Sequence, residues 1–289
     1  MTKLAPLALL VCALVTGGGA IPFPAPAAAG TQAIAHDRVL PLQGGRNFRD
    51  LGGYRTMDGH HVKWGMLYRS GSMHGLTQAD YAALEARGIR VVCDLRDSRE
   101  RAAEPVAWPE AHAPRLLSDD YALDQAGFMP KGPPESWTAD QARAAMTASY
   151  PPMLTRFNGQ FRRMFDELLA GHAPLAFNCS AGKDRTGLAA ALLLTALGVP
   201  RATVIEDYEL TNKTLNPAAL LAAGNKATPS PFGKLPPEVV APFMRADRAY
   251  IEAALAVVDG HKGGAPAYLQ DELGLGPAQI ARLRKLYLE

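Results

Sequence analysis

The sequence Pro174-Leu-Ala-Phe-Asn-Cys179-Ser-Ala-Gly-Lys-Asp-Arg185-Thr-Gly187 is the stretch that decides the fold. It begins with a short apolar run, residues 174–178, which is typical of a buried strand. An Ala/Leu-rich helix is expected from Thr186 to Leu197, and it ends at Gly198, a residue that easily takes the left-handed backbone of a helix C-terminus. The sequence therefore predicts a strand, a tight loop around Cys179 and a helix in direct succession.

Further strands are expected on both sides of this unit. The run Ile89–Leu95 has branched apolar residues without long alternation, which favours a parallel strand buried on both faces. Residues 115–118 predict another strand, and residues 47–54 and 62–68 flank Asp58-Gly59, a hairpin-type turn signal. Strands that alternate with helices predict an α/β fold, with a mainly parallel central sheet flanked by helices.

Helices are expected where apolar residues recur at helical spacing between capping residues. Thr77 is a suitable N-cap for the first of them, and Gly88 ends it. Residues 119–138 are rich in Asp, Gly and Pro and predict a loop that could form a lid. The other expected helices cover residues 139–149, 153–170, 202–210, 250–258 and 277–288.

The N-terminal residues differ in composition from the rest of the chain. Lys3 precedes an apolar stretch, Leu4–Val15, which is too short to span a bilayer as a stable helix, and small residues and a Pro/Ala-rich segment follow it. We expect residues 1–29 to be a cleaved signal peptide and linker, and residues 30–289 to be a single domain. The expected location is secreted or periplasmic, without a stable membrane anchor; an uncleaved N-terminal anchor is the alternative.

Composition excludes several classes of function. Hydrophobic residues make up 48% of the chain and charged residues 20%, which is usual for a soluble globular protein. The formal net charge is +2 and no Lys/Arg cluster with interleaved aromatic residues occurs, so we expect no nucleic-acid partner. The His residues show no metal-ligand spacing, and we predict no metal site. Composition leaves the oligomeric state open.

The loop after residue 178 has the residues that phosphate chemistry needs. A cysteine attacks phosphorus as the thiolate, and a helix N-terminus beside positive charge favours that form. Cys179 has this position, and Arg185 can bind two phosphate oxygens with its planar guanidinium. We therefore expect Cys179 and Arg185 to be catalytic, and phosphate to be bound by the loop residues Ser180, Ala181, Gly182, Lys183, Asp184, Arg185 and Thr186.

Three members of this loop have more specific expected roles. Gly182 lets the backbone turn tightly and approach the ligand. Thr186 can offer its hydroxyl to the sulfur of Cys179. Lys183 adds a cation that would suit a substrate with more than one phosphate, and the alternative is an ordinary surface lysine.

The segment Cys179–Gly187 resembles the signature of cysteine-based protein-tyrosine phosphatases, most closely a bacterial branch whose loop carries Gly-Lys-Asp-Arg. The resemblance extends to Asn47-Phe-Arg-Asp-Leu-Gly-Gly, Tyr68-Arg-Ser-Gly71, Asp94-Leu-Arg96, Asp207-Tyr208 and Thr211-Asn212. It implies a phosphocysteine intermediate on Cys179 that water hydrolyses, with no cofactor. The implied substrates are phosphotyrosine proteins, with phosphoserine or phosphothreonine proteins and phosphoinositides as further members of the class.

One residue departs from the family pattern. Asn178 stands where such enzymes usually have histidine, and an amide cannot carry charge. The resemblance therefore gives less support for a readily ionised thiol, and activity could be slower. Two other functions stay open: a catalytically weak or inactive module that binds phosphorylated ligands, and a rhodanese-like sulfurtransferase.

The proton donor for the leaving group has several candidates. Asp94 ends a predicted parallel strand, at the edge where open α/β sheets bind ligands, and the resemblance assigns this aspartate the role. Asp119 and Asp120 begin the predicted lid loop. Asp184, inside the phosphate loop, could orient Arg185 or the attacking water instead.

Two further expectations concern residues around the loop. Arg49, Asp50, Arg69 and Arg96 could hold the loop or contact the substrate, or form structural salt bridges. Cys93 ends a strand that could neighbour the one before Cys179, so we hypothesise a reversible disulfide between these two cysteines that switches activity off. The alternative is that Cys93 is a buried apolar residue.

Overall fold

A computed structural model of the chain describes residue 1 and residues 36–110, 113–222, 232 and 235–289. Apart from Met1, the expected signal peptide and linker, residues 1–29, lie outside these residues. His36–Glu289 form a single unit by their internal contacts. No helix among the described residues has the length and apolar character needed to cross a membrane.

A five-stranded sheet lies at the centre of this unit, with the strand order β1-β2-β5-β3-β4. The strands are β1 Arg49–Asp50, β2 Leu67–Ser70, β3 Val91–Asp94, β4 Arg115–Ser118 and β5 Leu175–Asn178. β5 is parallel to both β2 and β3, and β3 is parallel to β4, whereas β1 runs antiparallel to β2 at one edge. The sheet is therefore mixed but mainly parallel, as the sequence predicts.

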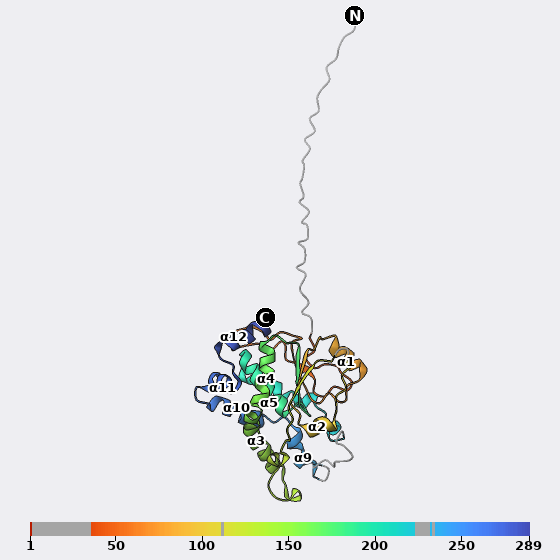
Figure 1. Cartoon of the computed structure of the whole chain (residues 1–289), viewed down its shortest axis with the longest axis vertical. Coiled ribbons are helices and arrows are strands. Elements are labelled where there is room, and N and C mark those ends of the chain that lie inside the picture. Colours follow the sequence, from red (N-terminus) through yellow and green to blue (C-terminus); the bar gives the residue numbers. More distant parts are fainter. Residues whose placement is uncertain (2–35, 111–112, 223–231, 233–234) are drawn as a thin grey trace. The chain divides into compact units, whose positions relative to one another are not determined.

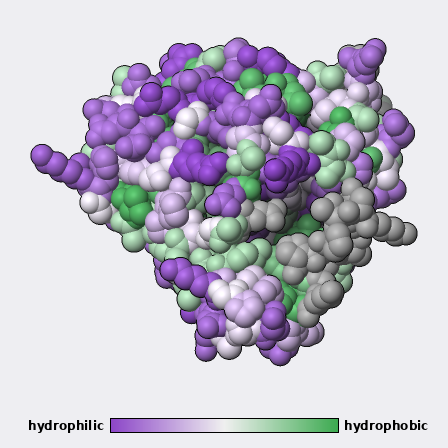
Figure 2. All heavy atoms as spheres, turned by 60° about the horizontal axis from the view of Figure 1, so that its bottom comes forward, coloured by the Kyte–Doolittle hydropathy of each residue, from purple (hydrophilic) through white to green (hydrophobic). Residues whose placement is uncertain are grey.

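Helices flank the sheet on both faces. They are α1 Gln78–Glu85, α2 Ser98–Ala103, α3 Ala139–Arg156, α4 Asn158–Leu169, α5 Asp184–Leu197, α6 Arg201–Glu209, α7 Thr211–Thr214, α8 Pro217–Ala222, α9 Pro237–Met244, α10 Arg248–Gly260, α11 Gly264–Leu273 and α12 Pro277–Tyr287. Figure 1 shows α4, α5 and α10 to α12 on one side of the sheet and α1 on the other. Hydrophilic residues cover much of the face in Figure 2, and hydrophobic ones are more frequent in its lower half.

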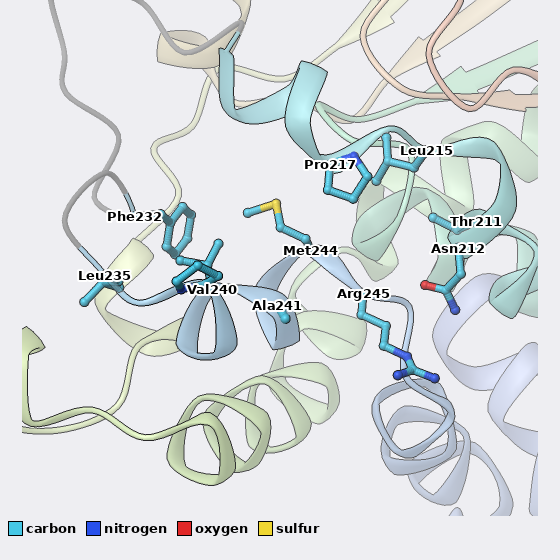
Figure 3. Close-up of a pocket in the computed structure, with 11 residues that line it drawn as sticks. Thr211, Asn212, Leu215, Pro217, Phe232, Leu235, Val240, Ala241, Met244 and Arg245 are labelled. Carbon is cyan, nitrogen blue, oxygen red and sulfur yellow. The ribbon is translucent and has the colours of Figure 1, made fainter.

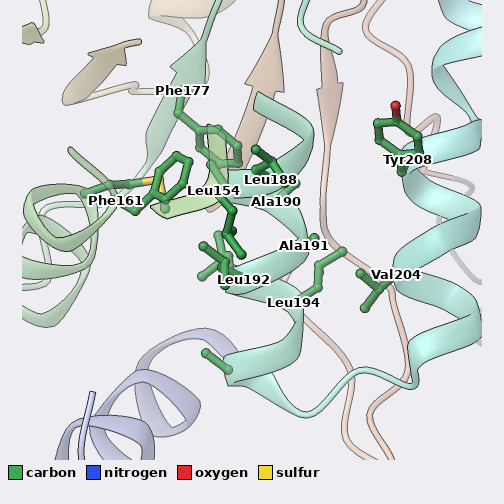
Figure 4. Packing of buried hydrophobic residues seen from close by; sticks show 14 of the residues in the cluster. Leu154, Phe161, Phe177, Leu188, Ala190, Ala191, Leu192, Leu194, Val204 and Tyr208 are labelled. Carbon is green, nitrogen blue, oxygen red and sulfur yellow. The ribbon is translucent and has the colours of Figure 1, made fainter. Parts of the chain in front are cut away.

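The core lies on both faces of the strands because neighbouring residues in a strand point to opposite sides. Val92 and Ala176 pack with residues of α1, whereas Cys93 and Phe177 pack in the larger cluster that contains α5. α5 is buried along almost its whole length, and Figure 4 shows its leucines and alanines among Phe177, Leu154 and Phe161. This explains why the sequence of α5 has no polar stripe.

Two predicted helix boundaries are wrong. The expected helices 139–149 and 153–170 divide at Phe157 instead, since α3 continues through Pro151 and Pro152. Proline removes a helical N–H donor and usually interrupts a helix. Here the buried residues Tyr150, Met153 and Leu154 keep α3 helical by packing into the core.

Candidate active site

Cys179 directly follows β5, at the carboxyl edge of the sheet, and α5 begins five residues later at Asp184. The thiol is 1% exposed and lines a cavity of about 250 Å³ together with the loop residues Ser180, Ala181, Lys183, Asp184 and Arg185. The predicted succession of strand, loop and helix is confirmed. It places the cysteine at the N-terminus of a helix, where the helix dipole favours a negative charge.

The carbonyl groups of the loop point away from the cavity, toward the segment 46–72. The Ser180 carbonyl accepts hydrogen bonds from the Ser72 N–H (2.9 Å) and from Arg46 Nη1 (3.0 Å). The Gly182 carbonyl accepts from Asn47 Nδ2 and Arg69 Nη2, both at 2.8 Å. In a trans peptide the N–H points opposite to the C=O, so the next N–H group in each case points toward the cavity side.

These N–H groups form a cradle for an anion. Within the described residues, the N–H groups of Ala181, Gly182 and Lys183 donate to no protein acceptor. Gly182 has φ +69°, and a side chain here would meet the backbone of Ser70 and Gly71 at 2.5 Å. Glycine is therefore required at this turn by both conformation and space.

Arg185 is held by Glu100, a residue of α2 that the sequence analysis did not single out. Arg185 Nη1 lies 2.6 Å from Glu100 Oε2, and Nη2 lies 2.6 Å from Glu100 Oε1. Nη1 also donates to the Leu95 carbonyl (3.0 Å) and the Tyr121 hydroxyl (2.8 Å). Glu100 thus binds the end of the guanidinium that Nη1 and Nη2 form.

The opposite edge of the Arg185 guanidinium is left for a ligand. In the part of the chain that the structure describes, Nε donates no hydrogen bond, and Nη2 donates only to Glu100, which leaves one Nη2 hydrogen without an acceptor. Nε–H and Nη2–H are parallel donors that match two oxygens of one phosphate. Burial raises the pKa of Glu100, but the hydrogen bonds and charge of Arg185 and the Ser180 hydroxyl have a larger effect and lower this pKa to about 2. Glu100 is therefore ionised at neutral pH and forms a salt bridge with the Arg185 guanidinium.

Lys183 is buried, and its amine is bound to backbone carbonyls. Its side chain is 1% exposed, and Nζ donates to the carbonyls of Phe243 and Arg245 (3.2 Å for the latter), at the C-terminal end of α9. The reading of Lys183 as a surface lysine is wrong. Its cation instead ties the phosphate loop to α9, where the helix carbonyls favour positive charge.

Asp184 has one oxygen engaged and lines the cavity. Its Oδ1 accepts a hydrogen bond from Tyr150 (2.6 Å) and lies 3.4 Å from Lys183 Nζ. The Tyr150 hydroxyl in turn lies 2.5 Å from that of Tyr208, and both phenols are buried. This chain of buried groups fixes the direction of the Asp184 carboxylate.

The other aspartates predicted as proton donors lie outside the cavity lining. Asp94 is buried and binds Arg96 through both oxygens, and its Oδ1 also accepts from Asn178 Nδ2 (3.1 Å). Asp119 pairs with Arg163 on the surface. Asp120, whose side chain is 92% exposed, pairs with Arg101. Among the described residues, Asp184 and Glu100 are therefore the carboxylates that line this cavity.

One smaller expectation, for Thr186, differs from the structure. The Thr186 hydroxyl donates to the Ser70 carbonyl at 3.3 Å and makes no hydrogen bond to the Cys179 sulfur. Asn178 uses its amide nitrogen on Asp94, while its Oδ1 is buried and has no hydrogen-bond partner among the described residues. Asn178, the residue before Cys179, is therefore linked to the Asp94–Arg96 pair.

Cys93 and Cys179, the two cysteines among the described residues, are free thiols. Cys93 pairs in register with Phe177, two residues before Cys179, an offset that separates the Cα atoms by roughly 8 Å in a parallel sheet. A disulfide bridges Cα atoms no more than about 7 Å apart. Burial raises the pKa of Cys93 to about 12, so this thiol is an inert core group, and a disulfide with Cys179 would need the backbone to move.

The cavity walls beyond the loop are apolar. They are formed by Leu123, Phe128, Met129, Met146, Met153, Leu220, Phe232, Phe243 and Met244. Phe232 and Met244 also line a second, larger cavity beside it, of about 640 Å³, shown in Figure 3. There Phe232 and Leu235 lie at one end and Asn212 and Arg245 at the other. The described residues contain no group of three or more His, Cys, Asp or Glu side chains that could hold a metal ion.

Residues 40–289 match the tyrosine phosphatase family. The chain belongs to this family. It is 33% identical over 270 residues to a protein of Cupriavidus necator named as a tyrosine-protein phosphatase, which covers 91% of this chain and 92% of that protein. It is 32% identical over 282 residues to the triple specificity protein phosphatase PtpB of Mycobacterium tuberculosis, covering 86% of this chain and 99% of PtpB.

A more distant likeness concerns a human protein. The solved structure of the tyrosine phosphatase-like serine/threonine/tyrosine-interacting protein is 13% identical, covers 54% of this chain and 87% of its own, and has a TM-score of 0.33. The family match identifies the chain as a protein-tyrosine phosphatase. It does not favour a binding module or a sulfurtransferase.

Proposed function

We propose that this phosphatase hydrolyses phosphate monoesters through a phosphocysteine on Cys179, with the phosphate bound by Arg185 and by the N–H groups of Ala181, Gly182 and Lys183. The observation that carries the proposal is the free Nε–Nη2 edge of Arg185, beside a cysteine and a cradle of unpaired N–H groups. Donors placed in this way stabilise the charge on the phosphoryl oxygens during transfer.

The proposed reaction has two steps. The Cys179 thiolate attacks phosphorus, the bond between phosphorus and the leaving oxygen breaks, and that oxygen takes up a proton from solvent water. Water then attacks phosphorus, the sulfur–phosphorus bond breaks, and the thiolate returns with inorganic phosphate as the product. Asp184 is the residue we assign to accept the proton of the attacking water, because Tyr150 fixes its Oδ1 and the side chain lines the cavity.

Phosphotyrosine is the substrate group that the cavity suits best. Its apolar walls, with Leu123, Phe128 and Phe243, would pack against a phenyl ring. The name of PtpB describes triple specificity for that relative. Phosphoserine, phosphothreonine and phosphoinositides are therefore the second class to test on this chain.

Release of phosphate from para-nitrophenyl phosphate tests the chemistry. We expect the Cys179→Ser variant to lose turnover and the Cys93→Ser variant to retain it, since Cys93 lies in the core away from the cavity. A Cys179→Ser variant that still turns over would exclude the cysteine mechanism. A panel of phosphotyrosine peptides, phosphoserine peptides and phosphoinositides then ranks the substrates by kcat/KM.

We also propose that the enzyme is exported, on the strength of the N-terminal sequence alone. The apolar stretch Leu4–Val15 and the Pro/Ala-rich segment after it support a cleaved signal peptide. Expression of the full chain in a Gram-negative host, followed by fractionation and N-terminal sequencing, tests this. Enzyme that is recovered from the cytoplasm with Met1 or Thr2 at its N-terminus would contradict export.

A further inference from the structure

We propose that Asn47 and Arg69 are positioning residues for the reaction: they hold the Gly182 carbonyl away from the cavity, and they thereby direct the Lys183 N–H toward the phosphate. The proposal rests on the proposed function of the loop. Its evidence is a buried network that joins three separate parts of the sequence, the motifs at 47–50, at 68–71 and at 207–208, to one peptide group of the phosphate loop.

Asp207, on α6, is the centre of this network. It accepts hydrogen bonds from Arg49 Nε (3.1 Å), Arg69 Nη1 (2.5 Å) and the Tyr54 hydroxyl (3.0 Å). Arg49, Arg69 and Asp207 are all 1% exposed or less. Burial raises the pKa of Asp207, but the positive charges of Arg49 and Arg69 have a larger effect and lower this pKa below its ordinary value. The carboxylate therefore stays ionised. Two arginines are thus held in fixed positions behind the loop.

Arg69 is bound at both ends of its guanidinium. Nη1 donates to Asp207, and Nη2 donates to the Gly182 carbonyl at 2.8 Å. β2 carries Arg69 beside β5, where its register partner is Phe177. The planar guanidinium therefore has one orientation only, and a lysine could not make both contacts in the same way.

Asn47 is oriented by its own partners. Its Oδ1 accepts from Arg49 Nη1 and from the Thr214 hydroxyl, so its Nδ2 is the end that faces the loop. Nδ2 lies 2.8 Å from the Gly182 carbonyl and 3.3 Å from that of Ala181. Asn47 has φ +53°, a left-handed conformation that asparagine tolerates better than most residues.

The consequence for the site follows from the geometry of one peptide group. Gly182 has little conformational preference of its own, so the peptide between residues 182 and 183 can rotate unless its carbonyl is held. Rotation would replace an N–H donor in the cradle by a carbonyl oxygen that repels the phosphate dianion. Two buried donors on this carbonyl prevent the exchange, and one of them is charged.

Binding of tungstate, a phosphate-like oxyanion, tests the proposal in the full chain. The variants are Asn47→Gly, which keeps the left-handed backbone accessible but removes the amide, and Arg69→Met. The control is Asn158→Ala, because Asn158 is also buried and hydrogen-bonded, to Glu272 and Tyr268, outside the cavity. We expect tungstate binding to weaken about tenfold in each of the two variants, and kcat to fall with it, while the control stays within about twofold.

The outcomes separate this proposal from the proposed function. Tungstate binding is measured by competition against para-nitrophenyl phosphate in the enzyme that keeps Cys179, and by thermal shift in a Cys179→Ser background, where no covalent step occurs. If this background does not bind tungstate at all, the assignment of the loop as a phosphate site fails. If it binds, but Asn47→Gly binds equally well, the positioning role is overturned, even where Arg69→Met does not fold.

Discussion

Glu100 meets Arg185 end-on, with each carboxylate oxygen 2.6 Å from one guanidinium nitrogen. Glu100 Oε2 also caps the first turn of α2, by accepting from the Asp97 N–H at 2.8 Å, and Oε1 accepts from the Ser180 hydroxyl. One carboxylate therefore joins the start of α2 to the phosphate loop and to its arginine. It determines which edge of the guanidinium faces a ligand.

Replacement of Glu100 by glutamine tests this relationship. Glutamine keeps the shape but removes the charge and one acceptor, so Arg185 should lose its fixed orientation. We expect kcat/KM for para-nitrophenyl phosphate to fall about 10- to 100-fold, as for the loss of a charged hydrogen bond. Glu209→Gln is the control, since Glu209 pairs with Arg248 on the surface. Equal activity of the two variants would contradict the role of Glu100.

The same pair should make stability depend on pH. The pKa of Glu100 is lowered from 4.5 to about 2, so its contribution is fully present above pH 4.5 and is lost as the pH falls through 2. A shift of this size corresponds to about 3 kcal/mol in the free energy of unfolding. Urea unfolding at pH 6 and at pH 2 should show that wild type and Glu100→Gln differ most at pH 6. A difference that grows toward low pH would reverse the expected sign.

Asparagine variants distinguish the roles of Asp184 and Asp94. Asp184→Asn keeps the contact to Tyr150 and should fold normally, with turnover reduced about 100-fold if the carboxylate accepts the proton of water. Asp94→Asn breaks a buried ion pair with Arg96 and should lower the free energy of unfolding by about 3–5 kcal/mol. Activity and urea unfolding are measured together on both. Full turnover of Asp184→Asn would return the catalytic role to Asp94, Asp119 or Asp120.

Loss of the Lys183 amine should loosen α9. In Lys183→Met the carbonyls of Phe243 and Arg245 lose their hydrogen-bond donor, so we expect faster amide hydrogen exchange in residues 237–244. Because Phe243 and Met244 line the cavity, we also expect a several-fold higher KM. Lys63→Met is matched to it, since Lys63 Nζ also binds a backbone carbonyl, that of Leu286. Exchange in α9 that is the same in both variants would show that Lys183 does not hold this helix.

Local sequence patterns predicted the parts of the fold that depend on local chemistry. The strand before Cys179, the helix after it and the end of that helix at Gly198 are as expected, because burial and a left-handed glycine are visible in consecutive residues. The continuation of α3 through Pro151 and Pro152 was not predictable in this way. It depends on packing against α9 and α10, which lie about a hundred residues further along the chain.

In the candidate site, too, some residues were predictable from local sequence and others depend on long-range contacts. Cys179 and Arg185 are found by their spacing, but Glu100 carries no signal of its own because a Glu in the first turn of a short helix is an ordinary capping residue. Only the fold brings it to Arg185. The contact of Lys183 with α9 is likewise a long-range one, and this is why the sequence leaves a surface lysine open as an alternative, which the structure shows to be wrong.

α5 carries Arg185 in its first turn and runs through the most buried part of the domain. A helix in this position cannot open locally without exposing the core, so the catalytic loop should share the cooperativity of the whole domain. On heating, enzymatic activity and tertiary structure should therefore disappear over one and the same temperature interval. We therefore expect no inactive state in which the domain is folded and only the catalytic loop is disordered.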